Sequence, residues 1–235
     1  CLLLIWASLG AGLVRAASEP IGKAESVQGG VAVEREGYSG PAAVNDPVNL
    51  LDKWQTKENS GAELVFVDAS RIKIGPNASL EITEYLYKPQ EKTREGLISM
   101  MSGKARFVVQ DLQDFKQKRL RVQTQTAVVG TRGTEYALWV VSPEITRILG
   151  ISNEVDFCQA KDPTACVTVG PRMMSEIKGD AAPGPPHIAS PEAIKEMVKG
   201  VEKAGAVAPP PPPPPGPPAM VSDSFDPTAS NLPQR

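Results

Sequence analysis

Few residues in this 235-residue chain are of the types that do chemistry. Its only histidine, His187, lies in a proline-rich stretch rather than beside a candidate nucleophile. Hydrolytic catalysis usually needs a base with a tuned pKa, and histidine is the commonest such base. A Ser-His-Asp or Cys-His arrangement is therefore not indicated, and the sequence contains neither an H-E-x-x-H motif nor a calcium-binding loop. We expect no catalytic residue, no cofactor and no metal site.

A glycine-rich segment, Gly130 to Thr134, has the composition of a phosphate-binding loop. It lacks the closing Lys-Ser/Thr, and a strand pattern follows it where phosphate binding would need the start of a helix. We interpret the segment as structural. Gly130 and Gly133 permit a positive φ or a close backbone approach, and Arg132 has five donors that suit neighbouring loop carbonyls or a carboxylate. The alternative is a direct contact between Arg132 and a ligand.

Two cysteines, Cys158 and Cys166, bracket the turn signal Asp162-Pro163 and are the only cysteines after the N-terminal apolar run. An even number of cysteines in an exported chain favours a disulfide. Two thiols without a nearby histidine cannot complete a four-ligand zinc site. The pair is predicted to form a disulfide across a β-hairpin; two free buried thiols are the alternative.

An uncharged apolar run from Leu2 to Val14 ends at Arg15-Ala16-Ala17. It is shorter than the roughly 20 residues that cross a bilayer and is typical of a secretory signal peptide. We expect residues 1–16 to be an N-terminally incomplete signal peptide, and the mature protein to be periplasmic or secreted. The alternative is a short uncleaved anchor, which would be the protein's only contact with a membrane.

The charges nearly balance, with 25 Lys and Arg against 27 Asp and Glu and a net charge of −2. No basic stripe with interleaved aromatic residues occurs, so nucleic acid is not expected as a partner. The 41% of hydrophobic residues is enough for a buried core.

Apolar and polar residues alternate between about Ser18 and Lys178, most clearly from Ala62 to Ile82. A period of two predicts half-buried β-strands, and Asp68-Ala69-Ser70 and Gly75-Pro76-Asn77 are turn signals between them. The segment from Tyr136 to Val141 is apolar on both faces, which predicts a fully covered central strand. We predict an all-β domain of short strands, either a sandwich or a short β-solenoid.

A helix with clear start and stop signals is predicted after the strand region. Ser190 is its predicted N-cap, Pro191 occupies the first helical position and Gly205 lies past the end. A helix this short is marginal alone, so it docks on the β domain or meets a partner. The predicted organisation is a signal peptide at 1–16, a β domain at 18–178, a linker at 179–189, an amphipathic helix at 190–205 and a disordered Pro-rich tail at 206–235.

The segment from Thr126 to Tyr136, TAVVGTRGTEY, resembles the signature of the FecR domain, in which a V-x-G-x-R-G-T-x-F/Y run opens an apolar strand. The resemblance spans about Ile21 to Lys178. Leu51 and Ala69 occupy positions where the family pattern has glycine, which leaves the local turn types open. Other elements resemble the family pattern in the same order, namely Asp52 to Thr56, Val67 to Ile74, Ser102 to Ala105 and Val169 to Met173.

The resemblance implies an exported cell-envelope module for protein binding or signalling rather than catalysis, whose partner is an undefined envelope protein or cell-surface polymer. One alternative is a structural or carbohydrate-associated surface protein, which would need Trp54 and Trp139 to be exposed. Another is the periplasmic part of a membrane-anchored sigma-factor regulator, if further residues precede Cys1. The signature residues in this chain are Gly130, Arg132, Gly133, Thr134 and Tyr136.

Overall fold

The structure, a computed structural model, describes residues 19–131 and 133–202. The predicted signal peptide at 1–16, Arg132, Gly205 and the Pro-rich tail at 206–235 lie outside the described residues. Within them the chain forms 17 β-strands and one helix. No helix in this part of the chain is long and apolar enough to cross a membrane.

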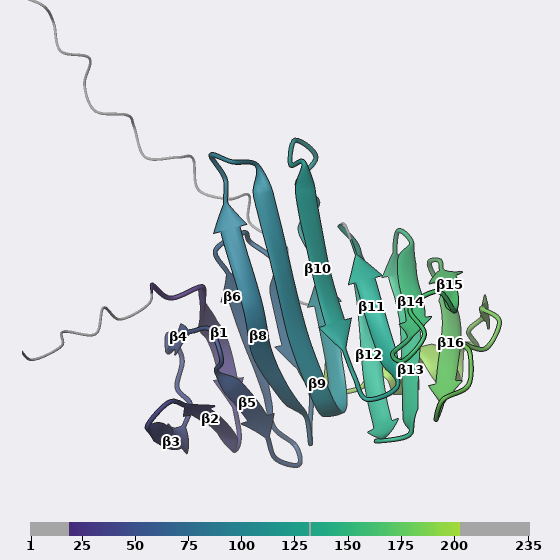
Figure 1. Cartoon of the computed structure of the whole chain (residues 1–235). Coiled ribbons are helices and arrows are strands. Elements are labelled where there is room, and N and C mark those ends of the chain that lie inside the picture. Colours follow the sequence, from purple (N-terminus) through teal and green to yellow (C-terminus); the bar gives the residue numbers. More distant parts are fainter. Residues whose placement is uncertain (1–18, 132, 203–235) are drawn as a thin grey trace, which may run out of the picture.

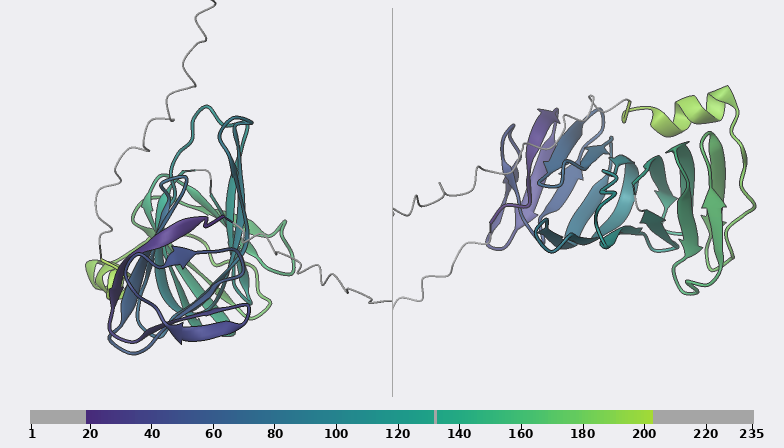
Figure 2. Two further views of the ribbon diagram at one scale, coloured as in Figure 1. Left: turned by 90° about the vertical axis from the view of Figure 1, so that its left-hand side faces the viewer. Right: turned by 90° about the horizontal axis from the view of Figure 1, so that it is seen from above.

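The strands form two layers around one hydrophobic core (Figures 1 and 2). All neighbouring strands are antiparallel except β9 and β10. In spatial order, sheet A comprises β4 (Pro47–Val48), β1 (Gly22–Gln28), β6 (Gly61–Phe66), β7 (Arg71–Ile74), the second part of β9 (Thr93–Val108), β12 (Glu135–Ser142), β13 (Ile145–Ser152), β16 (Met173–Lys178) and β17 (His187–Ile188). Sheet B comprises β3 (Tyr38–Pro41), β2 (Val31–Arg35), β5 (Lys53–Thr56), β8 (Ser79–Lys88), the first part of β9, β10 (Gln117–Gln123), β11 (Ala127–Thr131), β14 (Val155–Gln159) and β15 (Cys166–Val169).

Strand β9 belongs to both layers. Its first part pairs with β8 and β10 in sheet B, and from Gly103 onward it pairs with β7 and β12 in sheet A. Gly103 has a φ of 82°, and a Cβ at this position would lie 2.4 Å from the Cα of Ala78. A glycine is therefore needed where the strand passes from one sheet to the other.

Hairpins form in both layers along the chain: β6–β7 and β12–β13 lie in sheet A, and β2–β3, β8–β9, β10–β11 and β14–β15 lie in sheet B. The chain therefore advances along the molecule, from purple at one end to green at the other in Figure 1. The prediction of an all-β fold of short strands is confirmed, with two layers that remain open at their edges.

The alternating sequence pattern matches the burial of the strands. The predicted inward pairs Leu64 and Phe66, Ile72 and Ile74, and Leu80 and Ile82 all belong to the shared core. Burying a large aliphatic side chain contributes about 1.5–3 kcal/mol. Burial of these inward side chains between the sheets therefore stabilises the two-layer arrangement.

The two positions without the glycines of the FecR pattern keep the backbone that a glycine would adopt. Leu51 has a φ of 66° and Ala69 a φ of 65°. The backbone N–H of Ala69 donates to Phe66 O at 2.9 Å and that of Leu51 to Ile82 O at 2.8 Å. Both turns are thus retained although a side chain in the left-handed region costs about 1–2 kcal/mol.

The segment predicted as a linker at 179–189 is instead laid against sheet A. Its β17 pairs with Met173 and Met174 of β16, and the N–H of Gly184 donates to Glu176 O at 2.9 Å. The hydroxyl of Ser175 donates to Gly184 O at 2.7 Å. The Pro- and Gly-rich composition of residues 179–189 did not predict this pairing, because only the two residues of β17 adopt strand geometry.

The helix, α1 (Pro191–Val198), begins as predicted and ends earlier than the predicted span of 190–205. Ser190 caps it by accepting a hydrogen bond from the N–H of Ala193 at 3.1 Å. Gly200 then adopts a φ of 84°, which turns the chain out of the helix. Val201 beyond it is fully buried, so the apolar stripe continues past the helix as an irregular segment.

Helix α1 covers the outer face of sheet A. Met197, 1% exposed, packs with Ala137 of β12, Leu149 of β13 and Ala189, and Trp139 and Ile194 adjoin this cluster. Strand β12 is therefore covered on both faces from Tyr136 to Val140, whereas Val141, which the prediction included, is 37% exposed. Of the two predicted alternatives for the helix, docking on the β domain is confirmed.

Removal of residues from Ala181 onward is expected to destabilise the β domain, since Ala189, Met197 and Val201 would be lost and β12 uncovered. Loss of these buried side chains should cost on the order of 3 kcal/mol or more. At about 2–4 °C per kcal/mol, the melting temperature should fall by several degrees. The matched control removes only residues 203–235 and leaves all these contacts in place; equal melting temperatures for the two truncations would contradict the prediction.

Candidate functional site: the signature turn and the ion pair beside it

The signature turn joins β11 in sheet B to β12 in sheet A. Gly133 in this turn has a φ of 136°, and a Cβ there would lie 2.5 Å from the Cβ of Asp111. Glycine is thus required at this position for both conformation and space. Gly130 differs, because a Cβ there would find its nearest described neighbour 3.9 Å away, at Asp156. The predicted steric role is supported for Gly133 and not for Gly130.

The turn is held from two sides by hydrogen bonds. The hydroxyl of Thr134 donates to Ser152 O, and the side-chain amide of Asn153 donates to Gly133 O at 3.0 Å. On the other side, the N–H of Val109 donates to Thr134 O at 3.0 Å. Thr134 therefore links the turn to the end of β9 and to the β13–β14 turn.

Tyr136 is a core residue. Its side chain is completely buried, and its ring stacks on Phe107 with 5.0 Å between ring centroids. Burial raises the pKa of Tyr136 well above that of a solvated tyrosine, so the phenol stays protonated. The last signature position therefore anchors the turn in the core rather than presenting a group to a ligand.

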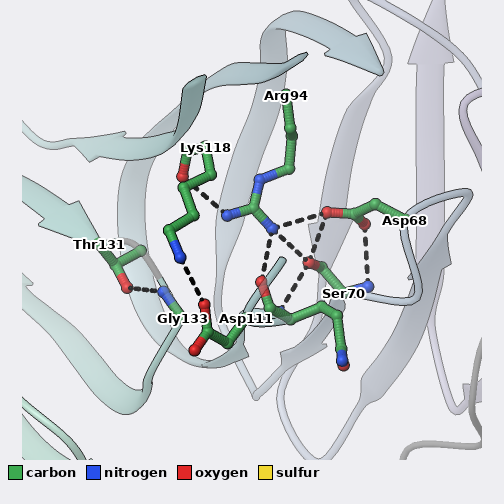
Figure 3. A network of polar contacts seen from close by, with 8 residues as sticks. Asp68, Ser70, Arg94, Asp111, Lys118, Thr131 and Gly133 are labelled. Carbon is green, nitrogen blue, oxygen red and sulfur yellow. Dashed lines mark hydrogen bonds and ion pairs between the residues drawn. The ribbon is translucent and has the colours of Figure 1, made fainter. Parts of the chain in front are cut away.

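A fully buried ion pair lies beside the turn (Figure 3). Arg94 of β9 donates from Nη1 to Asp68 Oδ2 at 2.9 Å, and both side chains are 0% exposed. The same guanidinium donates to Gln110 O and to Lys118 O, each at 2.8 Å. Arg94 thus ties together the β6–β7 turn, the segment after β9 and the start of β10.

Ser70 completes the coordination of Asp68. Its hydroxyl donates to Asp68 Oδ2 at 2.8 Å and its N–H to Asp68 Oδ1 at 2.9 Å. The same hydroxyl oxygen accepts a hydrogen bond from the N–H of Gln110 at 3.1 Å. Both carboxylate oxygens are therefore paired, which is the condition for burying a charge without a large penalty.

Two residues connect this pair to the signature turn (Figure 3). Lys118, whose carbonyl accepts from Arg94, donates from Nζ to Asp111 Oδ1 at 2.8 Å. Asp111 in turn occupies the space that a side chain at Gly133 would need. If Arg94 moved, the segment 109–118 would shift with it, and Asp111 would change its contact with Gly133 in the signature turn.

The buried phenol of Tyr85 near the ion pair is not suited to proton transfer at neutral pH. Burial raises the pKa of Tyr85 well above its usual value, and the negative charge of Asp68 raises it further against the opposing effect of Arg94. A phenol of this kind remains protonated at physiological pH and cannot act as a general base. Within the described ranges, no group of three or more His, Cys, Asp or Glu side chains could hold a metal ion.

The sequence pattern indicated Arg132, which lies outside the described residues, as the arginine clasp and did not indicate Arg94. Arg94 precedes Gly96, Ile98 and Met100 at steps of two, and all of these positions face inward. A charged residue in the inward phase of a strand is itself a signal of a buried pair. Asp68 was noticed only as part of a turn, because its partner is 26 residues away in the sequence.

The predicted disulfide between Cys158 and Cys166 is confirmed. The two residues face each other across β14 and β15, with 4.0 Å between their Cα atoms. Asp162 accepts hydrogen bonds from the N–H of Thr164 at 3.0 Å on its side chain and from that of Ala165 at 3.0 Å on its carbonyl. The expected turn between the cysteines is therefore formed.

Neither tryptophan provides the exposed platform that a carbohydrate-binding surface would need. Trp54 is 0% exposed. Trp139 is half-buried beneath α1, with the ammonium of Lys104 4.0 Å and the guanidinium of Arg147 5.4 Å from its ring centroid. The carbohydrate-associated alternative expects both tryptophans to be exposed, which is wrong for Trp54. The ring of Trp139 contacts cationic side chains of this chain.

Taken together, two antiparallel layers joined by a buried turn define an all-β module. Residues 52–155 match the family model described as FecR protein. The match includes the signature turn, both residues of the buried ion pair and the first residue of β14.

Two solved structures resemble the chain, both of a proposed anti-sigma factor from Parabacteroides distasonis. One has a TM-score of 0.49 and 14% identity and covers 64% of this chain and 66% of that one. The other has a TM-score of 0.47 and 11% identity and covers 63% of this chain and 65% of that one. The chain thus spans just under two thirds of the length of each. A comparison with curated proteins found no match.

Replacing Arg94 with Met is expected to lower the free energy of unfolding by about 3–5 kcal/mol, because Asp68 would be buried without a counter-ion. Asp68→Asn should cost a similar amount. The double variant should cost less than the sum, because the two changes remove one shared interaction. Urea unfolding followed by fluorescence measures all three.

The matched control is Arg121→Met. Arg121 lies on the outer face of β10, 53% exposed and 3.9 Å from Glu84, so its loss should cost less than about 1 kcal/mol. If Arg94→Met costs no more than Arg121→Met, the buried pair does not organise the domain.

Proposed function

We propose that this protein is an exported, non-catalytic module of the bacterial cell envelope that acts by binding another protein in signalling or assembly. The observation that carries the proposal is the FecR domain at residues 52–155. Such a domain supports a signalling or regulatory role in the envelope, where FecR domains are generally periplasmic.

Export is supported by two independent features of the chain. Disulfides such as Cys158–Cys166 persist in oxidising compartments and are rare in the cytosol. The apolar run from Leu2 to Val14 has the length and flanking residues of a secretory signal. Both features favour a periplasmic or secreted protein.

A non-catalytic role is supported by the state of the polar groups near the signature turn. The hydroxyl of Thr134 and the carbonyls of Gly133 and Thr134 are hydrogen-bonded to backbone or side-chain groups of the same chain. The single histidine, His187, lies on β17 at the surface rather than near the turn. The FecR family is moreover generally non-enzymatic.

The proposal predicts that the protein purified from the periplasm begins at Ala17 and contains no free thiol before reduction. Capture of the mature protein with envelope extracts should yield a protein partner that then binds the purified module saturably and reversibly. Accumulation in the cytoplasm of uncleaved protein with Cys158 and Cys166 as free thiols would refute export. Capture of glycan alone would replace the protein partner with a surface polymer.

For the signature turn we propose that Arg132 caps carbonyl oxygens and is not a ligand contact. Arg132→Ala should then leave acceptors unpaired, at about 1–3 kcal/mol each. Arg132→Lys should restore little, because an ammonium group cannot reproduce the planar guanidinium. Denaturant unfolding of the wild type and both variants measures this.

The competing reading makes Arg132 an exposed contact for an anionic ligand or partner. It predicts unchanged unfolding midpoints in both variants, since exposed charges contribute little to stability, together with weakened binding of the captured partner. That combination would assign Arg132 to the binding surface.

A further inference from the structure

The edges of the two sheets differ in how well they are protected against pairing with another strand. In sheet A the edge strands β4 and β17 have only two residues each, and β4 begins with Pro47. Strand β1, beyond β4, has a bulge between Ala24 and Ser26 and carries Glu25 on it. In sheet B, β3 ends at Pro41. Short strands, prolines, bulges and charges are the usual devices that block edge pairing.

Strand β15 is as short as β3, but it lacks the other three devices. Its four residues, Cys166-Val-Thr-Val169, carry no charge and no proline, and its pairing with β14 runs without a register shift. In the described part of the chain, residue-by-residue pairing of β15 is found with β14 alone. The other side of β15 is therefore an uncharged, regular sheet edge.

The hydrogen-bond pattern shows which backbone groups of β15 are free. The N–H of Gln159 donates to Ala165 O at 3.0 Å, so residue 165 faces β14. In an antiparallel pair the direction alternates along the strand, so Val167 and Val169 also face β14. The N–H and C=O groups of Cys166 and Thr168 then point outward, and no hydrogen bond from the described residues reaches them.

The edge is also rigid. The disulfide fixes Cys166 against Cys158 of β14, and Val169 is buried in the core while Val167 packs at its margin. A strand that is already held in an extended conformation loses little conformational entropy when another strand pairs with it. The disulfide thus holds β15 in the extended conformation that strand pairing requires.

We propose that two copies of this chain pair through β15 in an antiparallel arrangement, with the two-fold axis at Val167. Cys166 of each copy would then lie opposite the partner's Thr168, and the two pairs exchange four backbone hydrogen bonds. Val167 would meet the partner's Val167 on the inward face. Because the strand carries no charge, this register brings no like charges together, and a two-fold axis makes the contact closed.

The two B sheets become one continuous sheet in this dimer. An edge of four residues buries less area than the roughly 1,200–2,000 Å² of a stable interface. The dimer is therefore reversible and depends on protein concentration. This inference goes beyond the proposed function, because it needs no partner protein; it shares with that proposal only the disulfide.

The test uses the full mature chain with its disulfide intact. Thr168→Pro removes an outward N–H and leaves the hydrogen bonds to β14 in place, since proline is tolerated on the open side of an edge strand. Thr168→Val is the matched control, because it keeps the N–H and the branched shape. Sedimentation equilibrium from low micromolar to near-millimolar concentration gives the dissociation constants, and thermal unfolding verifies that each variant is folded.

The wild type and Thr168→Val should dimerise similarly, and Thr168→Pro should be weakened at least about tenfold. Amide exchange at Cys166 and Thr168 should slow as the wild-type concentration rises. Thr168→Lys serves as a second variant should the proline variant unfold, because a lysine on an edge strand opposes pairing. A wild type that stays monomeric at all concentrations overturns the proposal. A dimer that neither Thr168→Pro nor Thr168→Lys weakens also overturns it. So does an edge that binds only strands of another protein.

Discussion

The buried pair of Asp68 and Arg94 is the interaction on which the arrangement of the domain most depends. It holds the β6–β7 turn of sheet A against the first part of β9 and the start of β10 in sheet B. A buried pair stabilises little compared with an apolar replacement of the same volume, but breaking it leaves a buried charge unpaired. Lys118 and Asp111 extend the same network to the signature turn.

The sequence predicts the local structure well and the long-range contacts poorly. Alternation predicts β6, β7 and β8 and the inward side chains of each, because burial of one face leaves a period of two in the sequence. The proximity of Cys158 and Cys166 was also predictable, since eight residues and a turn signal leave few other geometries. Crossing of β9 from one sheet to the other could not be predicted, because the pattern of a strand is the same in either layer. The pairing of Arg94 with Asp68 depends on that crossing, so it could not be predicted from the sequence either.

The same limit explains the two misinterpretations at the C-terminal end. Residues 179–189 have the composition of a linker, yet they supply a short strand that covers β16. The apolar stripe of α1 continues to Val201 after the helix has ended at Val198, because the side chain follows the surface of sheet A rather than the helical period. In both places tertiary contacts with sheet A decide the structure, while composition reports only the absence of a long regular element.

The passage of β9 through both layers has a consequence for how the protein unfolds. Elongated proteins in which each unit contacts only its neighbours can lose structure from one end, one unit at a time. Here a single strand of 16 residues is paired on both sides in both sheets. The end strands are held through other neighbours, but the middle of neither layer can separate without breaking the pairing of β9. We therefore expect the central strands of the two layers to unfold together, although the molecule is extended in form.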